Sequence, residues 1–272
     1  SATGCEGTTW ENVRFIVSAP SYSMIYTNSR WLFKNCVFDC YNKLYLQLAG
    51  LCGLVNCHIE ARWLGNASGS IAGPRVFENC YIRHNYGGMP ADTIYFGCTL
   101  EDAHPTAYAG SFMWMLFCKL SGSTTVRAYN ITFVCIQGCY FRSGTRLVFR
   151  RYSSHATGCL ASVVGTKFEG AQVQLELGSS PPVPFRQVSF IGCHFDGCSP
   201  AIYSKISENI IERLVFDNCV FRNTSDVLGG TAGGIRDVIL TRCAANATTT
   251  ADSSLVSGDV MFDFKPSEIV VV

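Results

Sequence analysis

A short motif recurs at near-regular intervals along the chain, and it constrains the fold more than any other feature. Five copies are FKNCVFD at 33–39, LVNCHIE at 54–60, FENCYIR at 77–83, FIGCHFD at 190–196 and FDNCVFR at 216–222. With the central cysteine as anchor, weaker copies lie at Cys98, Cys118, Cys139 and Cys243, while Val13 and Thr166 occupy the anchor position in two more. Consecutive anchors are 18 to 27 residues apart. Self-similarity with such a period is typical of solenoid proteins.

The positions around the anchor predict strands. The position three residues before the anchor is apolar or aromatic in every copy, from Trp10 to Leu240, and so is the position two residues after it, from Phe15 to Ala245. The position between the anchor and the second apolar residue is mixed, and this alternation indicates a strand with one buried face. The residue before the anchor is Asn or Gly in nine of eleven copies, which suits a bend at positive φ.

Each copy therefore reads as a strand, a bend and a second strand, often followed by a third apolar segment such as 44–48 or 173–177. We predict an all-β fold, a single right-handed parallel β-helix of eleven to twelve coils, with residues 1–272 in one domain. A leucine-rich horseshoe would need a helical segment and an L-x-x-L-x-L motif in each repeat, and we find neither. Neither terminus reads as an amphipathic cap, so we expect the chain to be an excised part of a longer protein, or to cover its ends in an oligomer.

The asparagine bend followed by an apolar strand resembles the right-handed parallel β-helix of the pectate-lyase-like superfamily, which also includes phage tailspikes. The resemblance extends over about residues 8–265. It implies a polysaccharide partner, an extracellular or virion-surface location, and a homo-oligomer that is a trimer if the chain is tailspike-like. The chain lacks the clustered aspartates of the lyases and the Asp-Asp pair and Gly-His-Gly of the polygalacturonases. Because the same fold hosts lyases, hydrolases, adhesins and inert spikes, it does not assign an activity.

The anchor column accounts for nine of the 15 cysteines. Stacked strands lie about 4.8 Å apart, and parallel Cβ directions at that spacing keep neighbouring sulfurs from reaching disulfide geometry. We expect these cysteines to be reduced thiols packed in the core. The chain has no C-x-x-C pair, and none of its five histidines has a second histidine at ligand spacing. We therefore expect no metal and no cofactor.

Acidic side chains recur at the outward position three residues after the anchor. Asp39 and Glu60 lie on adjacent coils, as do Glu169 and Asp196, and an arginine follows each pair. Adjacent strands would hold the carboxylates of a pair about 5 Å apart at the backbone, which suits a glycoside hydrolase, and crowding would raise the pKa of one of them. We name Asp39, Glu60 and Glu101 as candidate catalytic residues. The alternative is a solvated salt-bridge ladder that keeps the sheet face soluble.

Long segments between the repeats, at 61–74, 83–92 and 101–112, fall on consecutive coils and would cluster on one side. Aromatic, histidine and arginine side chains lie in or beside them and suit a sugar site, because rings stack on pyranose faces and polar groups hold hydroxyls. The candidate substrate-binding residues are His58, Trp63, Tyr81, Arg83, Tyr86 and His104. The alternative is that these side chains pack the loops onto the coils.

The composition limits which kinds of partner the chain can bind. The chain has 21 basic and 20 acidic residues and a net charge of +1, which argues against broad nucleic-acid binding. The longest apolar runs, such as 112–118, are too short to span a membrane. We expect a β-helix that binds polysaccharide, and that also cleaves it if it acts as a lyase or glycoside hydrolase. The alternative is a structural spike, fibre or adhesin module without chemistry.

Overall fold

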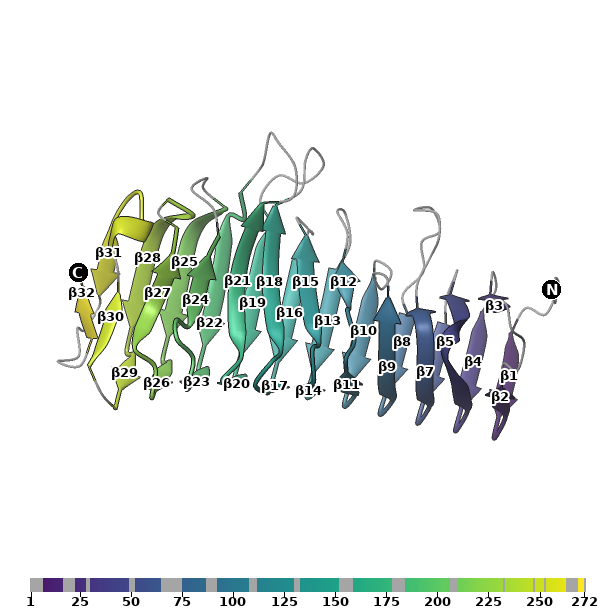
Figure 1. Cartoon of the computed structure of the whole chain (residues 1–272). Coiled ribbons are helices and arrows are strands. Elements are labelled where there is room, and N and C mark those ends of the chain that lie inside the picture. Colours follow the sequence, from purple (N-terminus) through teal and green to yellow (C-terminus); the bar gives the residue numbers. More distant parts are fainter. Residues whose placement is uncertain are drawn as a thin grey trace.

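The structure is a computed structural model, and it describes residues 7–16, 23–27, 30–48, 52–64, 75–86, 92–107, 112–129, 133–151, 159–177, 184–205, 210–231, 233–246, 248–251, 253–262 and 269–271. In these ranges the chain consists of strands and connecting bends, apart from one 3-10 helix, η1 (Ser253–Leu255). The strands form three parallel sheets (Figure 1): the first two extend from the N-terminal to the C-terminal end, and the third begins at β12 (Thr106–Ala107). The predicted all-β parallel β-helix is confirmed.

The first sheet takes one strand from each pass of the chain. Its twelve strands are hydrogen-bonded in chain order: β1 (Thr8–Glu11), β4 (Trp31–Lys34), β6 (Cys52–Val55), β8 (Arg75–Glu78), β10 (Thr93–Phe96), β13 (Phe112–Leu116), β16 (Phe133–Gln137), β19 (Leu160–Val164), β22 (Gln187–Ile191), β25 (Ile211–Asp217), β28 (Ile235–Thr241) and β31 (Val260–Phe262). The apolar position before the anchor lies on its inner face, where Leu54, Phe77 and Tyr95 are in register and fully buried.

The second sheet begins directly after each anchor. Its strands are β2 (Arg14–Ile16), β5 (Val37–Leu48), β7 (His58–Leu64), β9 (Tyr81–Tyr86), β11 (Thr99–Glu101), β14 (Lys119–Ser121), β17 (Tyr140–Phe141), β20 (Lys167–Glu169), β23 (His194–Asp196), β26 (Val220–Arg222) and β29 (Ala244–Ala245). A further strand, β3 (Ser23–Thr27), pairs with the second half of β5. The strands β5, β7 and β9 are longer than the rest of this sheet.

The third sheet covers the later part of the molecule. It contains β12 (Thr106–Ala107), β15 (Thr125–Tyr129), β18 (Arg146–Arg151), β21 (Gln172–Leu177), β24 (Ile202–Ser204), β27 (Asp226–Gly230), β30 (Thr249–Ala251) and β32 (Ile269–Val271). Eight successive coils, from the one that starts with β10 onward, therefore carry a strand of this sheet.

The bend between the first and second sheets has the conformation that its sequence predicts. All eleven bend residues have φ between 51° and 63°, a region in which Asn and Gly are favoured. Phe117 and Arg242 adopt the same positive φ at this bend although they are neither Asn nor Gly. The bend places the next residue, the anchor, inside the coil.

The anchor cysteines are buried and none forms a disulfide. Each thiol lies near two carbonyl oxygens: Cys57 Sγ is 3.4 Å from the oxygen of Val55 and 3.5 Å from that of Phe33 in the preceding coil. Thr166 occupies the anchor position in one coil and forms equivalent hydrogen bonds. Its hydroxyl donates to the carbonyl of Val164 at 3.2 Å and accepts the amide N–H of Cys139 at 3.3 Å. The predicted column of packed thiols is confirmed, and its weak hydrogen bonds link each coil to the one before.

A second inward column lies at the bend between the second and third sheets, and the sequence pattern did not predict it. Thr224 is buried there, and its hydroxyl donates to the carbonyls of Arg222 and Phe195, each at 3.1 Å. Cys198 is buried at the equivalent position one coil earlier, with its Sγ 3.6 Å from the carbonyl of Phe168. Both inner bends thus use small side chains that hydrogen-bond to the preceding coil.

Candidate functional site

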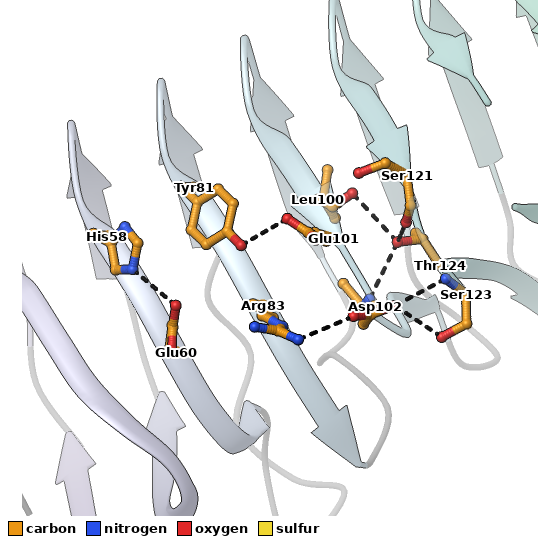
Figure 2. Close-up of polar contacts among 11 residues, drawn as sticks. His58, Glu60, Tyr81, Arg83, Leu100, Glu101, Asp102, Ser121, Ser123 and Thr124 are labelled. Atoms are coloured by element: carbon orange, nitrogen blue, oxygen red, sulfur yellow. Dashed lines mark hydrogen bonds and ion pairs between the residues drawn. The ribbon is translucent and has the colours of Figure 1, made fainter.

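The predicted site residues lie mainly on the outer face of the second sheet, on β5, β7, β9 and β11. Figure 2 shows five of them, His58, Glu60, Tyr81, Arg83 and Glu101. One row across these strands contains His58, Tyr81 and Thr99 in register. The residues two positions further along each strand form a parallel row of Asp39, Glu60, Arg83, Glu101 and Ser121. Because side chains alternate along a strand, both rows point away from the core.

His58 and Tyr81 form a stacked pair on this face. Their ring centroids are 4.6 Å apart and their planes are inclined by 17°. The side chain of His58 is 46% exposed, and Tyr81 is half-buried. The pair therefore offers an aromatic platform with one exposed ring at its edge.

The Tyr81 hydroxyl fixes the platform to the next strand. It donates a hydrogen bond of 2.8 Å to the Glu101 carboxylate, as Figure 2 shows. Burial of the phenol raises the pKa of Tyr81 to about 12, and the hydrogen bond and negative charge of Glu101 act in the same direction. Tyr81 therefore remains a neutral donor throughout the physiological pH range.

The three candidate catalytic carboxylates each have a partner. Asp39 pairs with Arg14 at 2.5 Å, Glu60 lies 3.2 Å from Nε2 of His58, and Glu101 accepts the Tyr81 hydroxyl. Asp39 and Glu60 are on adjacent strands, as predicted. Glu101 is two strands from Glu60, because Arg83 stands between them in the row, so their backbones are about 10 Å apart.

The corner that follows Glu101 contains an acidic residue that sequence reasoning did not select. Asp102 has φ of 49°, and its carboxylate accepts the amide of Ser123 at 2.9 Å and the Ser123 hydroxyl at 3.2 Å. Arg83 reaches the same carboxylate at 3.4 Å. The hydrogen bond from the Ser123 amide is the largest of the effects that lower the pKa of Asp102, and Arg83 adds to it. Asp102 thus orients Arg83 at the edge of the face.

The remaining predicted residues are less closely placed. His104 lies past the corner and is half-buried; burial is the main cause of its lowered pKa, and the charge of Arg127 contributes. The backbones of Trp63 and Tyr86 are paired in β7 and β9, whereas their side chains fall outside the described part of the structure. His58, Tyr81 and Arg83 are therefore the predicted binding residues that the structure brings together.

No group of three or more His, Cys, Asp or Glu side chains in the described ranges could hold a metal ion. The described residues also contain no helix that is long and apolar enough to cross a membrane.

Comparisons with known proteins assign no family. No protein-family model matches the chain, and no curated protein matches it. Among solved structures, the chain is weakly similar to QnrB1, described as a plasmid-mediated fluoroquinolone resistance protein, with 13% identity and a TM-score of 0.30 over 94% of this chain and 91% of that one.

Proposed function

We propose that the chain is a polysaccharide-binding β-helix of the pectate-lyase-like kind, displayed on a cell or virion exterior, and that the glycan lies on the outer face of the second sheet between β5 and β14. The observation that carries the proposal is the stacked pair of His58 and Tyr81 with charged side chains on both sides. Aromatic rings bind the apolar face of a pyranose, while carboxylates and guanidinium groups bind its hydroxyls.

The geometry favours binding over cleavage. Arg14 holds Asp39, and the imidazole of His58 lies beside Glu60. Tyr81 donates to Glu101. A glycoside hydrolase needs one carboxylic acid free to protonate the leaving oxygen and a second carboxylate to attack or to activate water. Partners on all three carboxylates instead suit a fixed set of hydrogen-bonding groups along a glycan.

A glycan array tests this proposal. The native chain should bind a subset of polysaccharides, and Tyr81→Ala should lose that binding. Tyr203→Ala is the matched control, because Tyr203 is also half-buried and lies on β24 of the third sheet, away from the face. An array that stays blank for the native chain, or equal loss in both variants, would reject the proposed face.

A second candidate function, a structural module without chemistry, is favoured by the outer face of the first sheet. The strands β10, β13, β16, β19 and β22 contain no charged residue. Large apolar side chains on them are exposed, including Trp114 at 40% and Leu160 at 44%. Contiguous apolar patches of this kind mark protein interaction sites.

This face would pack against another copy of the chain in an assembled spike or fibre. Sedimentation velocity should then show an oligomer, which the double variant Trp114→Lys/Leu160→Lys dissociates. A native chain that sediments as a monomer at high concentration would remove this candidate.

A further inference from the structure

The net charge of +1 conceals a strong separation of charge along the chain. Residues 103–168 contain seven Lys and Arg and no Asp or Glu, whereas residues 169–272 contain seven Lys and Arg and twelve Asp and Glu. In a β-helix a stretch of sequence becomes a stack of consecutive coils. The acid-free stretch, which we call the basic belt, therefore encircles one part of the molecule.

Four of the seven basic side chains of the belt lie on the second sheet and at its corner with the third sheet. Lys119 and Lys167 are exposed on the second sheet, on either side of Tyr140 in the same row. Arg142 and Arg146 are exposed at the two ends of the tight turn around Gly144, which the hydrogen bond from the Thr145 amide to the Arg142 carbonyl closes at 3.0 Å. Four cations thus lie on three neighbouring coils.

Few carboxylates neutralise this corner. Among the described residues, Lys119, Arg142 and Arg146 form no ion pair. Lys167 pairs with Glu169, the first acidic residue beyond the belt, at 3.3 Å. Arg142 and Lys167 also lie over the ring of Tyr140, at 5.4 and 5.3 Å from its centroid. The corner therefore concentrates positive charge that the rest of the described structure leaves largely unbalanced.

A recess lies beside Arg146. It has a volume of about 320 Å³ and is lined by residues that include Gly144, Gly170 and Gly197, stacked on successive coils, with Arg146, Gln172 and Ser199. The three glycines have positive φ and present no side chain. A ligand group could therefore approach the backbone closely at Gly197, where a Cβ would have no neighbour within 4 Å, whereas the Cβ positions at Gly144 and Gly170 face Gly122 and Ser143. A guanidinium, an amide and a hydroxyl lie within the same recess.

We propose that this corner binds the anionic groups of a charged glycan, with Arg142 and Arg146 as the principal contacts and Lys119 and Lys167 as flanking charges. Guanidinium groups form paired, charge-assisted hydrogen bonds with carboxylate, sulfate and phosphate oxygens. The shared chemistry is an anionic oxygen cluster, and the probes below separate its three sources.

A glycan fits the corner better than a single-stranded nucleic acid does. Nucleic-acid channels stack bases on open aromatic rings, whereas Arg142 and Lys167 both lie against the ring of Tyr140. The belt also continues the proposed glycan face, since Lys119 follows Tyr81 and Thr99 in the same row. The choice of a glycan, but not the existence of the anion site, rests on the proposed function.

The test measures binding of the full chain to dextran sulfate, polygalacturonate and polyphosphate, with neutral dextran and oligothymidylate for comparison. The triple variant Lys119→Gln/Arg142→Gln/Arg146→Gln should lose about tenfold or more in affinity for an anionic glycan. The slope of its log Kd against the logarithm of the salt concentration should be smaller by roughly two. The control Arg186→Gln/Arg213→Gln/Arg222→Gln removes the same charge from exposed arginines outside the belt and should change affinity by less than about twofold. Circular dichroism and the Tm confirm that both variants fold.

Equal losses in both triple variants would overturn the proposal, because they would show attraction to net charge alone. Tighter binding of polyphosphate or oligothymidylate than of either anionic glycan would overturn the choice of ligand. The variant Tyr81→Ala separates the two proposals. If it leaves anionic-glycan binding unchanged while the belt variant abolishes it, the belt site stands and the proposed second-sheet face fails.

Discussion

The ring of His58 stacks on the ring of Tyr81 with the centroids 4.6 Å apart, and the two residues come from adjacent coils that the anchor motif aligns. The pair exists because the parallel register places the position after each anchor directly over its counterpart. Its proposed role in glycan binding depends on Tyr81 remaining a neutral phenol that donates to Glu101.

The first prediction concerns the ionisation of Tyr81. Its pKa of about 12 in the folded chain exceeds the ordinary value near 10 of an unfolded tyrosine. The resulting stabilisation is complete below about pH 10 and declines as the pH rises from there through 12, because the folded state holds its proton longer. A tyrosinate absorbance titration of the native chain minus that of Tyr81→Phe should show this late ionisation. A difference curve centred near pH 10 would contradict it.

Thr166 tests the hydrogen bonds of the anchor column. Thr166→Val keeps the shape but leaves the buried amide of Cys139 without its acceptor, so the free energy of unfolding should fall by about 1–3 kcal/mol. Thr166→Cys restores the repeat and should change stability by less than about 1.5 kcal/mol. Urea denaturation measures both variants. Equal stabilities of Thr166→Val and the native chain would show that the hydrogen bond contributes nothing.

The variants Gly97→Ala and Gly192→Ala distinguish the stability lost to a close contact from the stability lost to backbone strain. Both have positive φ, 63° and 61°. A Cβ at Gly97 would lie 2.5 Å from Oδ1 of Asn79, whereas a Cβ at Gly192 would have no neighbour within 4 Å. Gly192→Ala should lose about 1–2 kcal/mol from φ alone, and Gly97→Ala should lose more. Adding Asn79→Ala should bring the Gly97→Ala loss back toward that of Gly192→Ala in thermal denaturation, and additive effects would argue against the contact.

The cysteines should differ sharply in reactivity. Cys135 is the half-buried one among the thirteen cysteines with described side chains, and the other twelve are buried. Burial also raises the pKa of thiols such as Cys159 and Cys198, to about 11 in each, which removes the reactive thiolate at neutral pH. Pulse labelling with a maleimide, mapped by mass spectrometry, should modify Cys135 well before the anchor cysteines. Rapid labelling of Cys118 or Cys219 would indicate that the coils open.

The fold was predictable because nearly every coil repeats the same pattern of apolar positions and bend residues. The apolar positions from Trp10 to Leu240 and the Asn or Gly bends define strands and corners without reference to distant residues. The second inward column, which includes Thr145, Cys198 and Thr224, was harder to recognise because threonine, alanine and cysteine alternate there. Small size and burial at the bend, rather than residue type, are what its members share.

The candidate site was predictable only in part. Register along the repeat brings His58 to Tyr81 and Asp39 to Glu60. The role of Asp102 depends on a corner conformation and on a serine 21 residues later in the next coil. No local sequence pattern predicts this contact. The basic belt was hidden because a net charge sums over the whole chain, whereas a solenoid displays each stretch of sequence on its own coils.

The most direct test of the proposed function is calorimetric titration of the best glycan from the array into the native chain, Tyr81→Ala and Tyr203→Ala. We predict saturable binding by the native chain and by Tyr203→Ala, and loss of about tenfold or more in affinity for Tyr81→Ala, because the stacking platform is gone. Undiminished binding by a folded Tyr81→Ala would contradict the claim that the second-sheet face holds the glycan.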